Sequence, residues 1–163
     1  MKIISDTGPI IGLAKIKKLY LLQHIADEVL IPLMVYKELF GKIGKESSEI
    51  DNALNDFIKT VNLKHTDESL KEIISELDEG EKQAINLAYS YHEENVLLLI
   101  DDRAGREAAQ KLGLPVTGLV GLLIRLKEKE FIQDVGSLIV ELRENNYWLS
   151  DDIVRIAKNL AGE

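Results

Sequence analysis

Acidic side chains stand at positions of this sequence where surface charges are uncommon. Asp6 directly follows the strand-like run 1–5, and Asp101 and Asp102 directly follow the apolar run 96–100. Carboxylates at the carboxyl ends of parallel strands face the crevice in which open α/β sheets bind ligands. The chemistry expected of such residues is the binding of a hard cation, because Mg²⁺ and Mn²⁺ prefer oxygen ligands.

Two glutamates add to this pattern from predicted helices. Glu38 lies inside the apolar stripe of the helix predicted for residues 32–40, and Glu81 shares a helical face with Ala84 and Ile85. Burying a charge without a partner costs free energy, so each glutamate needs a cation or a hydrogen-bond donor. One metal site shared by all these acids supplies that partner.

Each acid also has an ordinary structural interpretation. Asp6, and one aspartate of the later pair, fit the N-cap of the following helix. Glu38 fits an internal salt bridge, or the edge of a stripe that water still reaches. Glu81 fits a capping box with Asp78, three residues earlier. We favour the shared metal site because it replaces four separate coincidences with one cause.

Composition narrows the chemistry further. The chain has no cysteine, and His24, His65 and His92 show no ligand spacing, which disfavours zinc, thiol and disulfide chemistry. No stretch approaches the roughly 20 apolar residues of a membrane helix, and the start lacks the pattern of a signal peptide. We therefore expect a cytoplasmic protein with no membrane partner.

The formal net charge of −8 opposes binding to nucleic acid, which depends largely on lysine and arginine. Bound cations would invert the sign of the charge at the acidic site itself. Arg103 and Arg106, and a cluster at Lys15, Lys17 and Lys18, are the candidate contacts to a phosphate backbone. Each of the lysines also fits an ordinary solvated position on a helix.

The 163 residues, 45% of them hydrophobic, predict one domain over residues 1–163, with a helical C-terminal extension from about residue 119. Strands alternate with helices, which predicts an α/β fold with a parallel sheet covered on both faces. The last helix carries an apolar stripe that fits either the core or a contact with a second protein. The strands are expected at 2–6, 28–31, 60–63, 96–100 and 115–117, the first five helical segments at 9–26, 32–40, 46–58, 69–92 and 102–112, and a polar loop at 41–48.

The chain resembles the PIN-domain nucleases, in particular a group of small prokaryotic proteins. The resemblance rests on residues 4–11, 77–88, 98–106 and 113–118, taken in this order and spacing. It implies a three-layer α/β/α sandwich with a short central parallel sheet. It also implies a site of three or four acids that binds Mg²⁺ or Mn²⁺ and hydrolyses phosphodiester bonds.

Position by position, the resemblance assigns Asp6 as the first family acid, Glu38 as the second, Glu81 as the third and Asp102 as the fourth. Asp101 stays an alternative for the fourth acid. The expected metal ligands are Asp6, Glu81 and Asp102, or Asp101 in its place. Glu38 is expected to complete the shell or to hold its waters. Thr7, Arg103 and Arg106 are the expected contacts to the substrate.

The function implied is that of an Mg²⁺- or Mn²⁺-dependent endoribonuclease acting on single-stranded or structured RNA. Many small relatives are toxins of toxin–antitoxin pairs, so an antitoxin protein and a homodimer are expected partners. The rival is a PIN-like binding or regulatory module without turnover. A phosphatase of the haloacid dehalogenase type is disfavoured because no second aspartate stands two residues after Asp6, and a receiver domain because the acidic pair comes late in the chain.

Overall fold

The computed structural model of the protein describes residues 1–41, 44 and 46–163; residues 42, 43 and 45 of the predicted loop lie outside the described residues. The described chain forms a five-stranded sheet in the order β3-β2-β1-β4-β5, and every neighbouring pair is parallel. The strands are β1 (Lys2–Ser5), β2 (Glu28–Pro32), β3 (Ile58–Val61), β4 (Val96–Leu99) and β5 (Val116–Thr117).

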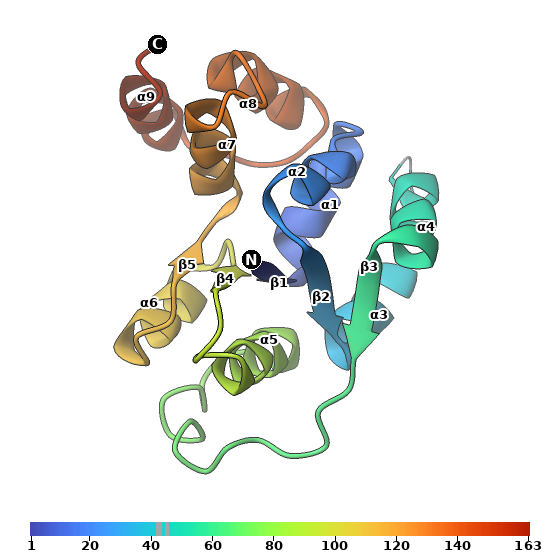
Figure 1. The fold of residues 1–163 in the computed structure, drawn as a ribbon. Coiled ribbons are helices and arrows are strands. Elements are labelled where there is room, and N and C mark those ends of the chain that lie inside the picture. The colour runs from blue at the N-terminus through green and yellow to red at the C-terminus, as the bar shows by residue number, and fades with distance from the viewer. Residues whose placement is uncertain (42–43, 45) are drawn as a thin grey trace.

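Helices cover both faces of this sheet, so the predicted three-layer α/β/α architecture is confirmed (Figure 1). One face carries α5 and α6, and the other packs against α1, α4, α7 and α8. The α-helices are α1 (Thr7–Lys15), α2 (Leu22–Ile25), α3 (Leu33–Phe40), α4 (Ser47–Asp56), α5 (Glu79–Ser90), α6 (Arg103–Lys111), α7 (Leu119–Glu128), α8 (Val135–Glu144) and α9 (Asp151–Leu160).

The two layers are built from alternate residues of the same strands. Ile3 and Leu97 are buried in the core beneath α1 and α7, whereas their neighbours Ile4 and Leu98 are buried beneath α5 and α6. Successive side chains of a strand point to opposite faces of the sheet, so a strand buried on both faces must be apolar throughout. This requirement explains the uninterrupted apolar run of β4, all four residues of which are buried.

The strand order places a topological switch between β1 and β4. The chain leaves β1 toward β2 and β3, and later crosses to β4 and β5 on the other side of β1. Ligands of open α/β sheets bind outside the carboxyl ends of the strands at such a point. The backbone N–H of Asp6 donates to the Leu99 carbonyl oxygen at 2.9 Å, so Asp6 stands at this crevice.

Two predicted elements differ from the observed ones. The third strand starts at Ile58 and not at residue 60, because the buried Ile58 pairs with Val29 and fixes the register. The helix expected from residue 69 begins only at Glu79. Residues 68–76 before it form turns, and Asn86 of α5 holds the chain just ahead of them by accepting from the Asp67 N–H and donating to the His65 carbonyl oxygen.

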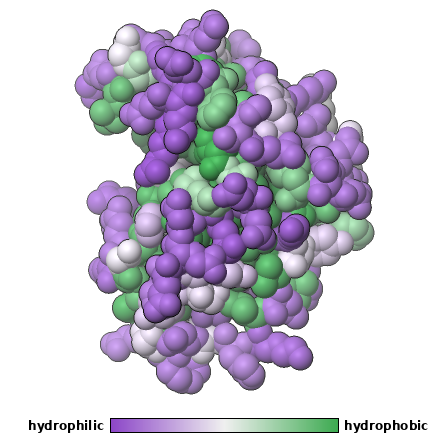
Figure 2. Space-filling view, viewed as in Figure 1, coloured by the Kyte–Doolittle hydropathy of each residue, from purple (hydrophilic) through white to green (hydrophobic). Residues whose placement is uncertain are grey.

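Helices α7, α8 and α9 gather at one end of the molecule beside β5 (Figure 1). In Figure 2 the outline is hollowed between this group and the part that contains α6, and apolar atoms reach the surface there. In the part of the chain that the structure describes, none of the helices combines the length and the apolar character needed to span a bilayer.

Candidate metal centre

Asp6 begins the site directly after β1. It is the N-cap residue of α1 with extended backbone angles, yet its side chain makes no capping hydrogen bond. An N-cap side chain accepts from the N–H of the second or third helical residue, here Gly8 or Pro9, and proline has no N–H to donate. Because no capping bond forms, the carboxylate of Asp6 is left for another role.

The electrostatic environment of Asp6 disfavours its charge. Its pKa is raised to about 6, mainly by burial and to a smaller extent by the charges of Asp78, Glu38 and Asp101, while a hydrogen bond from the backbone N–H of Thr7 lowers it. Loss of hydration and nearby like charges both disfavour the charged form of a carboxyl group. A bound cation would remove this penalty.

Glu38 reaches the same crevice from α3. Its Oε2 accepts a hydrogen bond from the Thr7 hydroxyl at 2.5 Å. Its Oε1 lies next to Gly80 in the first turn of α5, where a Cβ would stand only 2.7 Å away. Within the described residues Glu38 forms no ion pair with lysine or arginine, so the internal salt bridge considered for it is absent there.

Glu81 combines its two predicted roles. The capping box exists: the Glu81 N–H donates to Asp78 Oδ1 at 2.8 Å, and the Asp78 N–H donates to Glu81 Oε2 at 3.3 Å. Glu81 is only 6% exposed. Its pKa is raised to about 7, mainly by burial and further by the charges of Asp78, Asp102 and Asp6. Glu81 is thus a cap residue that also faces the other acids.

Gly80 shows how closely these carboxylates approach one another. A Cβ at this position would lie 2.7 Å from Glu38 Oε1, 3.3 Å from Asp6 Oδ1 and 3.5 Å from Asp78 Oδ1. Oxygens of three acids therefore converge on one point, and only glycine leaves that point free. Sequence analysis missed both Gly80 and Asp78 as parts of the site. The spacing of Asp78 three residues before Glu81 was the available signal, because it puts both on one helical face.

The adjacent aspartates after β4 have different environments. Asp102 is exposed and caps α6 by accepting from the Gly105 N–H at 3.1 Å. Asp101 Oδ1 accepts from the Leu119 N–H at 2.7 Å, at the start of α7. Its Oδ2 is buried and, among the described residues, is the one buried side-chain oxygen or nitrogen without a hydrogen-bond partner.

Burial raises the pKa of Asp101, while the Leu119 N–H and the charge of Arg106 lower it. The charge of Asp101 acts on Asp6, and that of Asp102 acts on Glu81. Both aspartates therefore belong electrostatically to the acidic cluster. A buried oxygen without a donor costs free energy, and a cation is one partner that relieves this cost.

The donor set fits a hard divalent cation, because it consists of carboxylate oxygens. Within residues 1–41, 44 and 46–163, no three acid or histidine side chains stand in an arrangement that would hold a metal ion as it is. Binding would thus require the side chains to close in from the positions described. The orphaned Asp101 Oδ2 and the space beside Gly80 are the two features that support such a rearrangement.

The predicted substrate contacts occupy distinct positions. Thr7 is 8% exposed and its hydroxyl is engaged by Glu38. The Arg106 guanidinium donates to the carbonyl oxygens of Ile100 and Asp101, which fixes the turn that presents the acidic pair. Arg103 is 84% exposed and pairs only with Glu107, at 2.8 Å, among the described residues. Arg103 is the freer of the two arginines.

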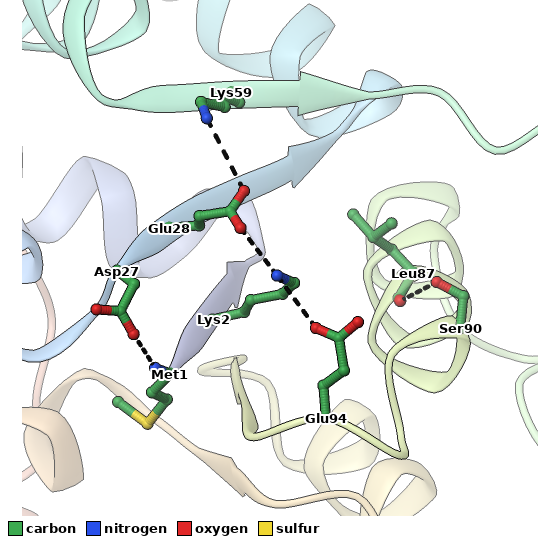
Figure 3. A network of polar contacts seen from close by, with 8 residues as sticks. All are labelled: Met1, Lys2, Asp27, Glu28, Lys59, Leu87, Ser90 and Glu94. Carbon is green, nitrogen blue, oxygen red and sulfur yellow. Dashed lines mark hydrogen bonds and ion pairs between the residues drawn. The ribbon is translucent and has the colours of Figure 1, made fainter.

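At the opposite end of the sheet, acidic side chains are paired with basic groups (Figure 3). There Lys2 Nζ lies 2.8 Å from Glu28 and 3.1 Å from Glu94, and the amino terminus pairs with Asp27. Hydrogen bonds to the two glutamates raise the pKa of Lys2. Acids at the amino ends of the strands thus have basic partners, whereas acids at the carboxyl ends gather around one another.

The model of a family described as PIN domain matches residues 2–163. The chain belongs to the PIN-domain family, as its sequence motifs indicated. PIN domains are in general nucleases, and they typically use divalent metals. No curated protein matches the chain.

Proposed function

We propose that this PIN domain is an Mg²⁺- or Mn²⁺-dependent endoribonuclease. The observation that carries the proposal is the convergence of Asp6 and Glu38 beside Gly80, at the carboxyl ends of β1 and β4. Carboxylates held close together at a sheet crevice supply the ligands that these two cations prefer.

Asp6, Glu81 and the pair Asp101 and Asp102 are the proposed ligands, with Glu38 completing the shell. The cation would supply Lewis-acid chemistry, lowering the pKa of a bound water and neutralising charge on the phosphate. Thr7 fixes one oxygen of Glu38 so that the other points toward Gly80.

RNA is the proposed substrate, in single-stranded or structured form. The formal net charge of −8 opposes binding along an extended duplex, so we expect recognition to be local. Arg103, exposed on the first turn of α6 beside the acidic pair, is the proposed backbone contact. Arg106 also holds together the turn that presents the acidic pair.

The test is cleavage of a panel of labelled single-stranded and hairpin RNAs with Mg²⁺ or Mn²⁺, with EDTA as control. We expect wild-type protein to cut, and Asp6→Asn and Glu81→Gln to have lost cutting by about 100-fold or more. Glu94→Gln is the matched control, because it removes a carboxylate at the opposite end of the sheet, where Lys2 keeps Glu28 as a partner (Figure 3).

Equal traces of cutting in wild type and both site variants would point to a contaminating nuclease and overturn the assignment. Metal binding without any cutting would move the protein to the rival class, a PIN-like binding or regulatory module.

We further propose that the protein is the toxin of a toxin–antitoxin pair and contacts another protein chain, an antitoxin or a second copy of itself. Ile153, Ile156 and Leu160 support such a contact, since they lie on one face of α9 and are 40%, 50% and 68% exposed. Growth arrest on expression, relieved by Asp6→Asn, tests the toxin role. The molar mass in solution tests the homodimer.

A further inference from the structure

A cavity of about 390 Å³ lies beside the acidic pair. Asp101 and Arg106 line this cavity, together with the start of α7 and the segment Tyr147, Trp148 and Leu149. Its volume is at the small end of the roughly 300–1,000 Å³ typical of ligand pockets. Since Asp101 belongs both to this wall and to the acidic cluster, the cavity adjoins the candidate metal centre.

Trp148 is the unusual feature of this cavity. It is the single tryptophan of the chain, and it is 81% exposed. Its two neighbours are held in place: Tyr147 packs against Gly12 of α1, and the Leu149 carbonyl oxygen accepts from the Arg143 guanidinium at 2.6 and 3.0 Å. A large, flat apolar ring is therefore presented to solvent on an anchored backbone.

Two basic side chains lie near this segment of an otherwise acidic chain. Lys15 Nζ donates to the Asn145 carbonyl oxygen at 3.1 Å, and Arg106 donates to the carbonyl oxygens of Ile100 and Asp101. Arg106 also lines the cavity, together with Asp101, whose pKa its charge lowers. Arg106 is therefore the cation that the cavity offers to an anionic ligand.

We propose that this cavity is a nucleotide subsite, in which one unpaired RNA base stacks on Trp148 while its phosphate faces Arg106. Sequence-tolerant binding of single strands combines aromatic platforms with nearby cations in this way. The subsite rests on the proposed ribonuclease function and adds to it a preference for unpaired RNA. It places one flanking nucleotide beside the acids that would act on the neighbouring phosphate.

The test uses the fluorescence of the only tryptophan, so the signal reports on the subsite itself. A short single-stranded RNA is titrated into Asp6→Asn protein, which is expected to bind without cutting. We expect quenching on binding, and about 5- to 100-fold weaker binding, measured by anisotropy, when Trp148→Ala is added. Trp148→Phe retains most of the affinity.

Two controls separate stacking from charge and from nonspecific apolar contact. An abasic oligomer of equal length keeps the phosphates, and we expect it to leave the fluorescence unquenched. Val140→Ala removes an exposed apolar side chain that lines a different cavity, and we expect unchanged affinity.

Unchanged affinity in Trp148→Ala, or equal quenching by the abasic oligomer, overturns the subsite. Cleavage by wild-type protein is measured in parallel. If metal-dependent cutting persists while the stacking signal is absent, the subsite alone fails; if no RNA is cut, the proposed function fails as well. Quenching by a protein partner but not by RNA would also overturn the subsite, by assigning the cavity to a protein interface.

Discussion

The Thr7 hydroxyl donates a hydrogen bond to Glu38 Oε2 at 2.5 Å, across 31 positions of sequence. Thr7 is the first residue of α1, and Glu38 lies in the last turns of α3. The bond ties the two helices together at the crevice and fixes one carboxylate of the candidate site. It also turns Thr7 from a predicted substrate contact into a residue that positions an acid.

Replacing Thr7 with valine removes the hydroxyl donor but keeps the size and shape of the side chain, so the Glu38 carboxylate should become more mobile. In Thr7→Val we expect the free energy of unfolding to fall by about 1–2 kcal/mol, since a half-buried carboxylate loses a hydrogen bond. RNA cleavage should fall roughly 10- to 100-fold, because small misplacements in a site are costly. Urea denaturation and single-turnover cleavage measure the two effects.

Thr7→Ser is the control, because it keeps the hydroxyl and should behave as wild type. A fully active Thr7→Val would show that the bond has no role in the site.

The raised pKa values of Asp6 and Glu81 predict how the free energy of unfolding depends on pH. Both carboxyls hold their protons more tightly in the folded protein than in the unfolded chain, where the ordinary values are 3.8 and 4.5. The folded state thus binds more protons, and stability of the metal-free protein falls as pH rises from about 4 through the folded pKa values of about 6 and about 7.

Asp6→Asn removes one of these charges. We expect it to raise the free energy of unfolding of the metal-free protein at pH 8 by about 1–2 kcal/mol, after allowing for solvent screening. Its profile between pH 4 and pH 8 should be flatter than that of wild type. Chemical denaturation at several pH values in EDTA measures both effects. Equal profiles for the two proteins would mean that Asp6 carries no such penalty.

The roles of Asp101 and Asp102 in metal binding can be distinguished by asparagine variants, because these keep the hydrogen bonds that each side chain accepts from the backbone. The amide oxygen in Asp101→Asn still accepts from Leu119, and asparagine caps helices as well as aspartate, so Asp102→Asn leaves α6 capped. We expect Asp101→Asn to weaken Mn²⁺ binding about tenfold or more. Asp102→Asn should weaken it less, because Asp101 Oδ2 is the oxygen that is buried without a hydrogen-bond partner. Calorimetric titration with Mn²⁺ compares them. The reverse order would give the role of fourth acid to Asp102.

Substituting Gly80 should disturb the candidate metal site more than the stability of the fold. In Gly80→Ala the new Cβ would meet Glu38 Oε1 at 2.7 Å, so the flexible end of Glu38 has to move away. We expect cleavage to drop roughly tenfold or more, while stability stays within about 0.5 kcal/mol or rises, since alanine suits a helix better than glycine. Gly41→Ala is the control, because its nearest contacts are ordinary ones at 3.6 and 3.8 Å. Normal cleavage by Gly80→Ala would show that the space beside Gly80 is not used.

The sequence by itself determined the features that depend on chain neighbours. Apolar runs predicted the strands that end before Asp6 and Asp101, and the spacing of Asp78 and Glu81 predicted the capping box that the structure contains. Strand ends and caps depend on residues within one turn or one strand, so local patterns carry them. The PIN-domain architecture followed from the order of these local patterns.

Only the tertiary structure decided which atoms meet. The approach of Glu38 to Gly80, the Thr7 bond and the unpartnered oxygen of Asp101 join elements that are distant in sequence. The two hydrogen bonds from Asn86 to residues 65 and 67 likewise join α5 to a segment about 20 positions earlier. Such contacts are set by how the crossovers pack helices onto the sheet, and packing to within an ångström is a property of the whole core, which no local pattern encodes.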